Sequence, residues 1–159
     1  MKKNKIIILI LSILITLSCN KAQKDEENNI LIAYITDIEK VLNRTIIPQS
    51  SGLYYIKLKS VAGSDLLTTP IAGDTLSLSY KGYILPDTTN AFVEKSLDIY
   101  VFKKDNVIEG WEEGISLMKK GEDAKIVIPS KLAYGKVQTA VIPPYSILMF
   151  NVTMVDKKP

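Results

Sequence analysis

The chain has 159 residues, of which 47% are apolar and 23% are charged, as is typical of one folded domain with a short extension. It contains no histidine, which excludes Ser-His-Asp and Cys-His catalysis and any His-ligated metal site. Its single cysteine excludes an intrachain disulfide and a thiolate zinc cluster, so we expect no metal and no cofactor. Arg44 is the only arginine, and because specific base recognition relies on arginine, nucleic-acid binding is not expected.

The first 18 residues have the pattern of an export signal. Three lysines within residues 1–5 precede an almost wholly apolar run at residues 6–17, which is too short to span a bilayer. Cys19 follows the expected cleavage point, and a lone cysteine there resembles the lipidation site of bacterial lipoproteins. We expect an exported lipoprotein, anchored at Cys19 in the outer membrane and facing the periplasm or the cell surface. An ordinary signal peptide with an incidental cysteine is the alternative.

Removal of this signal changes the charge balance. The formal net charge of the whole chain is +3, from 20 basic and 17 acidic residues. Lys2, Lys3 and Lys5 would leave with the signal, so the mature chain would be formally neutral. An electrostatic role at nucleic acid or at an acidic membrane therefore has no support from the composition.

Two segments separate the signal from the main domain. Residues 19–29 are polar and charged, and we predict a solvated tether. Apolar side chains recur at spacings of three and four over residues 30–42, which predicts an amphipathic helix that begins at Asn28 or Asn29. This helix and its connector fill residues 30–48. We expect the helix to pack on the following domain. A dimer or partner interface is the alternative, so the oligomeric state stays open.

Residues 49–159 are predicted to form an antiparallel α+β domain. The predicted strands cover residues 53–61, 75–84, 97–102, 124–129 and 146–155. One short helix is predicted within residues 107–118. Leu76, Leu78 and Tyr80 share one face of their strand, so Tyr80 should point toward the core. Because the strands do not alternate with helices, an antiparallel sheet is favoured over a doubly wound one.

Several motifs of this domain occur in a fixed order. They are Leu76-x-Leu78-x-Tyr80-x-Gly82, Val107-Ile108-x-Gly110-Trp111-Glu112-Glu113-Gly114, Ile128-Pro129-x-x-x-Ala133-Tyr134-Gly135, Ile142-Pro143-Pro144 and Leu148-x-Phe150-x-Val152. In this order and spacing, the region from about residue 52 to residue 155 resembles the FKBP-type peptidyl-prolyl cis-trans isomerase family. Together with the leader, residues 51–55 resemble exported lipoprotein members of that family from Bacteroidota.

The resemblance implies an FKBP-like sheet of about five strands wrapped around one short helix, with a shallow apolar pocket that binds proline. It implies catalytic roles for Tyr80, Ile108, Trp111, Tyr134 and Phe150. It implies substrate-binding roles for Phe92, Tyr100, Val107, Val141 and Ile142. In this picture Trp111 forms the floor, the Ile108 N–H and the Tyr134 hydroxyl meet the substrate, and the last two residues overhang the pocket. Ordinary core packing is the alternative interpretation of the aromatic side chains.

Two positions depart from the family pattern. The family has Phe-Asp where this chain has Phe92-Val93, so the acidic residue of the pocket is missing unless Glu94 reaches its place. On the next strand, Asp98 stands where the family has an aromatic residue. We therefore count Asp98 among the substrate-binding candidates, and expect it either to take over the polar role or to weaken the pocket wall.

The function implied by this resemblance is isomerisation of X–Pro bonds in exported or envelope proteins. The clients would be proline-containing polypeptides, and macrolide inhibitors of the family are further candidate ligands. Such a reaction suits a chain without histidine, because twisting an amide requires neither proton transfer nor a covalent intermediate. The alternative is a lipid-anchored binding or chaperone module with the same pocket and little catalysis, which Val93 and Asp98 motivate.

Overall fold

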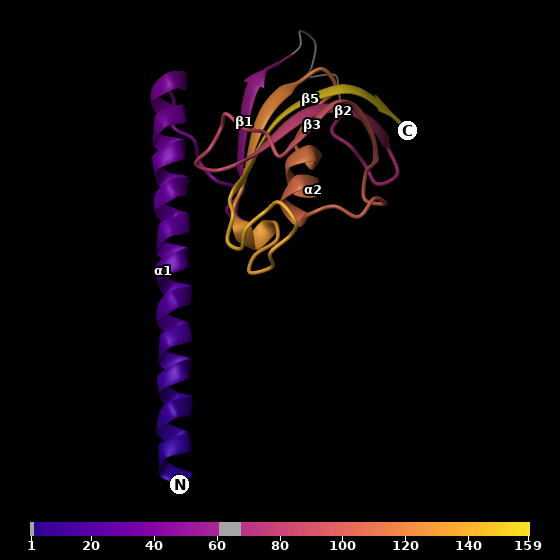
Figure 1. Cartoon of the computed structure of the whole chain (residues 1–159). Helices are drawn as coiled ribbons and strands as arrows, with labels where there is room; N and C mark the ends of the chain where they lie inside the picture. Colours follow the sequence, from indigo (N-terminus) through magenta and orange to yellow (C-terminus); the bar gives the residue numbers. More distant parts are fainter. Residues whose placement is uncertain (1, 61–67) are drawn as a thin grey trace.

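The computed structural model describes residues 2–60 and 68–159, with side chains described from residue 21 onward. Its elements are α1 (Lys2–Leu42), β1 (Tyr54–Lys59), β2 (Thr75–Ile84), β3 (Val93–Val101), α2 (Glu109–Ser116), β4 (Asp123–Ile128), the 3-10 turn η2 (Ser130–Leu132) and β5 (Leu148–Lys158). All strand pairs are antiparallel, and the sheet order is β1-β4-β5-β2-β3. The sheet curves around α2, while α1 stands on its other side (Figure 1). The predicted α+β class, an antiparallel sheet of five strands wrapped around one short helix, is confirmed.

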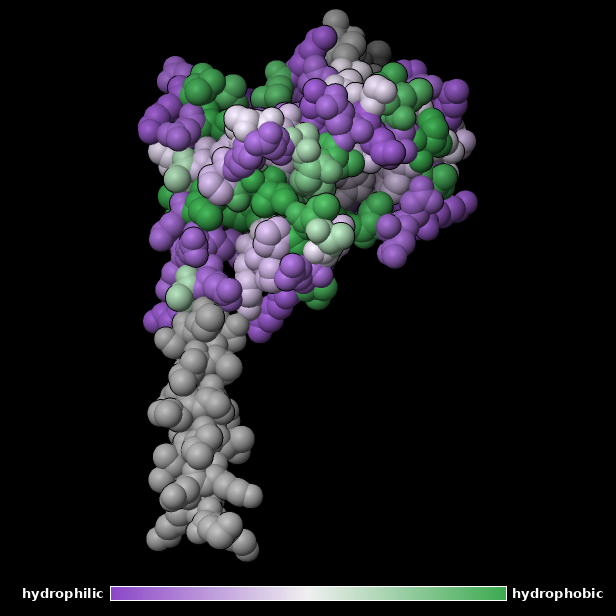
Figure 2. All heavy atoms as spheres, viewed as in Figure 1, coloured by the Kyte–Doolittle hydropathy of each residue, from purple (hydrophilic) through white to green (hydrophobic). Residues whose placement is uncertain are grey.

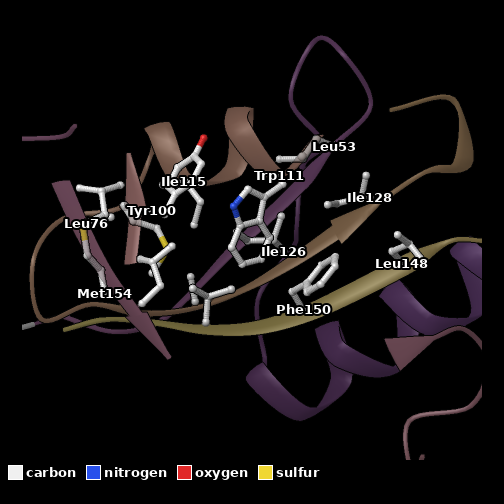
Figure 3. Packing of buried hydrophobic residues seen from close by; sticks show 14 of the residues in the cluster. Leu53, Leu76, Tyr100, Trp111, Ile115, Ile126, Ile128, Leu148, Phe150 and Met154 are labelled. Carbon is white, nitrogen blue, oxygen red and sulfur yellow. The ribbon is translucent and has the colours of Figure 1, made fainter. Parts of the chain in front are cut away.

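The main hydrophobic core lies between the inner face of the sheet and α2. Alternation along β5 directs Leu148, Phe150, Val152 and Met154 into this core, as predicted. Figure 3 shows Trp111 of α2 pointing at the strands, with Ile126 and Phe150 beside it. On the face shown in Figure 2, apolar side chains gather mainly in the middle of the domain, with polar side chains around them.

Helix α2 lies very close to β4, and two glycines allow this approach. A Cβ on Gly114 would stand 2.6 Å from the Cγ2 atom of Ile126, and a Cβ on Gly110 would collide with Ile128. The two glycines are four residues apart, so they share the helix face that meets the sheet. Because neither glycine has a side chain, the helix can approach the sheet closely, and Trp111, which lies between them in the sequence, is buried in the core.

Helix α1 is longer than the sequence predicted. It runs without interruption from Lys2 to Leu42, so residues 19–29 are helical and Asn28 and Asn29 do not cap it, while residues 21–26 are exposed to solvent. The physical reason is that this segment contains no Gly or Pro and that six of its eleven residues are Lys, Ala, Gln or Glu, which favour helix even when solvated. Among the described residues, no helix combines the length and apolar character needed to cross a membrane.

The C-terminal part of α1 packs against the outer face of the sheet, as expected. A second apolar cluster joins Ile35 of α1 to Ile56 of β1, Val127 of β4 and Met149 of β5. The helical residues that contribute to this cluster are Ile30, Leu31, Tyr34, Ile35, Ile38 and Leu42. The sheet is therefore covered on both faces, by α2 on the inside and by α1 on the outside.

Strand β3 is also longer than predicted, since it begins at Val93 rather than at residue 97. Its first residues, Glu94 and Lys95, are exposed and charged, so they lack the apolar alternation that sequence patterns detect. Pairing with β2 nevertheless extends the strand, because Val93 lies opposite Gly82 and Glu94 opposite Lys81. The position of β3 at the edge of the sheet is compatible with this polar character.

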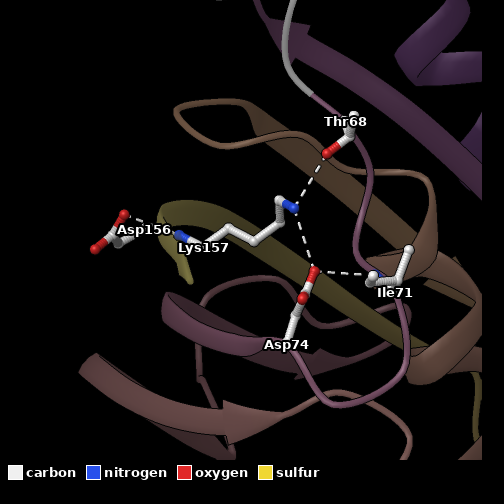
Figure 4. A network of polar contacts seen from close by, with 5 residues as sticks. All are labelled: Thr68, Ile71, Asp74, Asp156 and Lys157. Carbon is white, nitrogen blue, oxygen red and sulfur yellow. Dashed lines mark hydrogen bonds and ion pairs between the residues drawn. The ribbon is translucent and has the colours of Figure 1, made fainter. Parts of the chain in front are cut away.

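A polar network fastens the C-terminal strand to the turn before β2 (Figure 4). Asp74 is only 2% exposed, and its carboxylate accepts a 3.0 Å hydrogen bond from the Ile71 N–H. The same carboxylate lies 3.2 Å from the ammonium group of Lys157, which also donates to the Thr68 hydroxyl. These contacts, led by the backbone hydrogen bond, hold the pKa of Asp74 below its usual value.

Candidate active site

A pocket of about 410 Å³ opens between the start of α2 and the inner face of the sheet. Nine of the eleven side chains predicted for a proline site line it, and they come from β2, β3, β5, α2 and three loops. These nine are Tyr80, Phe92, Asp98, Tyr100, Val107, Ile108, Trp111, Tyr134 and Phe150. Residues that are 70 positions apart in sequence, such as Tyr80 and Phe150, therefore converge on one hollow.

The inner end of the pocket is a set of aromatic rings in edge-to-face contact. The ring centroids of Tyr80 and Trp111 are 4.8 Å apart, and those of Trp111 and Phe150 are 4.9 Å apart. Phe92 extends the set, with its ring 5.7 Å from that of Phe150. Trp111 is only 7% exposed. Edge-to-face rings pack tightly and hold one another in place, so they form a rigid apolar surface.

The wall of the pocket contains one polar pair. The hydroxyl of Tyr80 donates a 2.7 Å hydrogen bond to Oδ2 of Asp98 on the neighbouring strand β3. Burial raises the pKa of the Tyr80 hydroxyl well above its ordinary value, and the nearby Asp98 carboxylate raises it further. The hydroxyl therefore stays protonated, and the carboxylate of Asp98 is held at the pocket wall.

Ile108 lies directly before α2, with extended backbone angles of φ −68° and ψ 147°. Its carbonyl accepts hydrogen bonds from the backbone N–H groups of Trp111 and Glu112. Within residues 21–60 and 68–159, its own N–H has no recorded acceptor. A backbone donor is thus left free beside the apolar pocket, where it can meet a carbonyl oxygen of a bound chain.

The outer rim of the pocket is apolar and partly exposed. Tyr134, on the loop after η2, is 39% exposed, and Val107 is 36% exposed. Ile99 of the edge strand β3 also lines the pocket and is 58% exposed. If a side chain of a bound polypeptide enters the pocket, this rim can contact the polypeptide residues that precede and follow it.

Two of the predicted residues do not line the pocket. Val141 is 63% exposed, whereas Ile142 is 4% exposed and belongs to the main core. The cause is a tight turn, in which the Thr139 hydroxyl accepts hydrogen bonds from the N–H groups of Val141 and Ile142. This turn directs one side chain outward and the next into the core, so neither overhangs the hollow. The side chain of Cys19 lies outside the described residues.

Sequence reasoning missed several pocket residues. Asp105 and Asn106 lie at the pocket, and the carboxylate of Asp105 accepts a 2.7 Å hydrogen bond from the Val101 N–H. Because they directly precede Val107 and Ile108 in the sequence, they could have been predicted as pocket residues. The remaining unpredicted lining residues are Leu78, Val93, Ile99 and Leu148. These are apolar strand residues, which sequence alone does not separate from ordinary core.

Comparison with known proteins gives consistent matches. The family model for FKBP-type peptidyl-prolyl cis-trans isomerase matches residues 68–155. The FKBP-type peptidyl-prolyl cis-trans isomerase FkpA of Escherichia coli (strain K12) is 38% identical over 112 residues, which cover 69% of this chain and 39% of FkpA. The peptidyl-prolyl cis-trans isomerase FPR2 of Saccharomyces cerevisiae is 34% identical over 105 residues, which cover 64% of this chain and 78% of FPR2.

The crystal structure of FkpA from Escherichia coli superimposes with a TM-score of 0.64 at 26% sequence identity. The superposition covers 96% of this chain and 70% of the FkpA chain, so it includes both the domain and most of α1. In sequence, however, the match spans only about two fifths of the Escherichia coli relative. The likeness is therefore strongest in the domain that carries the pocket.

Proposed function

The chain belongs to the FKBP-type peptidyl-prolyl cis-trans isomerase family, and from this premise we propose that it accelerates cis–trans isomerisation of X–Pro bonds in polypeptide clients. The observation that carries the proposal is the apolar pocket with Trp111 at its centre, framed by Tyr80 and Phe150. A proline side chain is compact and apolar, so it suits a rigid aromatic hollow.

The reaction requires only rotation about the amide bond. Its barrier of about 18–20 kcal/mol comes from amide resonance, which is lost in the twisted transition state. A pocket that excludes water favours the twisted amide over the more polar planar one. The free N–H of Ile108 and the hydroxyl of Tyr134 would bind carbonyl oxygens of the client and hold the chain on either side of the rotating bond. No proton is removed, so the chain needs no general base.

Asp98 bears on the choice between catalysis and simple binding. The binding-module alternative was motivated by Val93 and Asp98, which break the family pattern. The hydrogen bond from Tyr80 gives Asp98 a defined position in the pocket wall, which supports its role as the substitute acidic group. This geometry favours the isomerase function, and no feature of the described residues favours the alternative.

An isomerisation assay on the full chain with a proline-containing peptide tests the proposal. We expect the rate to exceed that of the uncatalysed reaction, which takes tens to hundreds of seconds. Trp111→Ala should lower kcat/KM at least about tenfold, since the floor of the pocket is lost, whereas Trp111→Phe should retain part of the activity. A macrolide inhibitor of the family should compete with the peptide. A wild-type rate equal to the uncatalysed rate would refute the function.

Export and lipidation form a second, separate part of the proposal. The charged and apolar segments of residues 1–18 and the position of Cys19 support a lipoprotein that is anchored in the outer membrane and acts on exported or envelope proteins. Labelled palmitate should be incorporated into the wild-type chain in a bacterial host and not into the Cys19→Ala variant. Cell fractionation with surface proteolysis would then distinguish a periplasmic from a surface-exposed domain. Label that persists in Cys19→Ala would contradict the anchor.

A further inference from the structure

One side chain of α1 makes a two-point contact with the domain that carries the pocket. The carboxylate of Glu27 accepts hydrogen bonds from the backbone N–H of Ser130, at 2.7 Å, and from its hydroxyl, at 2.8 Å. The two residues are 103 positions apart, and Ser130 is only 4% exposed. Hydrogen bonds to a carboxylate are stronger than those between neutral groups, so this contact fixes Ser130 from outside the domain.

Ser130 in turn holds the turn that ends at the pocket rim. Its carbonyl accepts hydrogen bonds from the N–H groups of Ala133, at 2.9 Å, and of Gly135, at 2.8 Å. Tyr134 lies between these two donors, and its own carbonyl accepts a 3.0 Å hydrogen bond from the Val137 N–H. The backbone that carries the Tyr134 hydroxyl is thus built around the residue that Glu27 binds.

The contact between Glu27 and Ser130 lies beside a cavity. A cavity of about 580 Å³ lies between α1 and the turn, and Lys24, Lys131 and Lys136 line it beside Glu27 and Ser130. Beside this cavity, the two hydrogen bonds of Glu27 connect α1 directly to the turn. On the opposite side Leu132 anchors the turn in the main core, where it is 7% exposed.

We propose that Glu27 is a positioning residue for the pocket: by binding Ser130 it holds the turn at residues 130–135, and with it the Tyr134 hydroxyl, over the bound substrate. Through this contact α1 is part of the working enzyme rather than only a connection to the membrane. The inference rests on the proposed isomerase function, since Tyr134 matters here as a group that meets the client.

Three variants of the full chain test this role, with Glu26→Ala as the matched control on the exposed neighbouring residue. Glu27→Ala removes both hydrogen bonds to Ser130 and should lower kcat/KM about three- to tenfold, the effect of weakening the one hydrogen bond that the Tyr134 hydroxyl makes with the client in the transition state. Ser130→Ala removes only the hydroxyl contact and should have a smaller effect. Glu27→Gln can accept from the N–H and donate to the hydroxyl, so it should retain most of the activity.

A double-mutant cycle with Tyr134→Phe separates positioning from general damage. If Glu27 acts through the Tyr134 hydroxyl, Glu27→Ala should have little further effect on kcat/KM in the Tyr134→Phe background. An equal loss in both backgrounds, or wild-type activity in Glu27→Ala, would overturn the inference while leaving the isomerase function intact.

Amide hydrogen exchange provides a readout that does not depend on catalysis. The N–H groups of Ala133 and Gly135 should exchange several-fold faster in Glu27→Ala than in Glu26→Ala, because their acceptor on Ser130 is no longer held. Unchanged exchange at these two amides would refute the positioning role. An inactive wild-type chain with this exchange difference would instead contradict the proposed function and leave the contact between α1 and the turn established.

Discussion

The hydroxyl of Tyr80 donates a 2.7 Å hydrogen bond to Oδ2 of Asp98, which joins β2 to β3 inside the wall of the pocket. The sequence points to both residues as site candidates but not to their pairing, because they lie 18 positions apart and Tyr80 follows two core leucines. The pair places a carboxylate in direct contact with the aromatic set. It also keeps the Tyr80 ring in contact with Trp111.

Removal of this carboxylate should impair the pocket without unfolding the domain. We expect Asp98→Ala to lower kcat/KM about three- to tenfold, because the Tyr80 hydroxyl loses its partner and the ring becomes less fixed against Trp111. Asp98→Asn keeps an acceptor oxygen and should fall between the wild type and Asp98→Ala. The measurement is the rate of peptide isomerisation at a temperature well below the melting temperatures of all three proteins, so that each is folded during the assay. Asp98→Ala with full activity would show that the pair has no part in the reaction.

The close approach of α2 to β4 should make Gly114 sensitive to any side chain. In Gly114→Ala the added methyl group would lie 2.6 Å from Cγ2 of Ile126, so the helix or the strand must shift. We expect a loss of about 1–3 kcal/mol in the free energy of unfolding, as is typical of overpacked cores. Urea denaturation measures this loss. Glu109→Ala, on the exposed side of the same helix, is the control and should change stability by less than about 1 kcal/mol. Equal effects of the two substitutions would contradict the tight contact.

Much of this domain could be predicted from the sequence, because its elements show strong local patterns. The alternation of Leu76, Leu78 and Tyr80 gave the correct inner face of β2, and β5 was recognised in the same way. The identity of most pocket residues came from the family resemblance rather than from periodicity. Alternation alone would have left Trp111 and Phe150 as ordinary core residues.

The failures have two physical causes. Residues 19–29 were predicted to be a tether because they are polar, but burial is not needed for a helix that continues from neighbouring turns. The second cause is long-range geometry. The contacts of Glu27 with Ser130 and of Tyr80 with Asp98 depend on how distant elements meet, as does the outward direction of Val141, and no local pattern encodes this.

The network around Asp74 should make stability depend on pH in the acidic range. The pKa of Asp74 is lowered in the folded chain, so its contribution is fully present above its unfolded pKa of about 4 and is lost as the pH falls through the folded value. Between pH 5 and pH 2, the free energy of unfolding should therefore fall less in Asp74→Asn than in the wild type. Some pH dependence should remain in the variant, because Asp156 also has a lowered pKa. Urea midpoints across this range provide the test, and parallel curves for the two proteins would contradict it.

Glu122 carries the most buried carboxylate among the described residues, and its removal should destabilise the domain. Its side chain is fully buried, and one oxygen lies 2.8 Å from the ammonium group of Lys57 on β1. The other oxygen accepts hydrogen bonds from the Lys119 N–H, at 2.9 Å, and from the Tyr55 hydroxyl, at 3.3 Å. Burial and this carboxylate together raise the pKa of Tyr55 well above its ordinary value, so the hydroxyl remains a donor.

Glu122→Ala would remove the buried carboxylate that accepts hydrogen bonds from the Tyr55 hydroxyl and the Lys119 N–H. We expect a loss of about 1–3 kcal/mol in the free energy of unfolding, the range for losing the hydrogen bonds of a buried polar group. Lys57→Met is the matched control. The side chain of Lys57 is 42% exposed, so its removal should have a smaller effect, although it leaves the carboxylate without its counter-charge. Urea denaturation of both variants gives the comparison. A larger loss for Lys57→Met than for Glu122→Ala would show that the ion pair, rather than the hydrogen bonds to Tyr55 and Lys119, holds β1 in place.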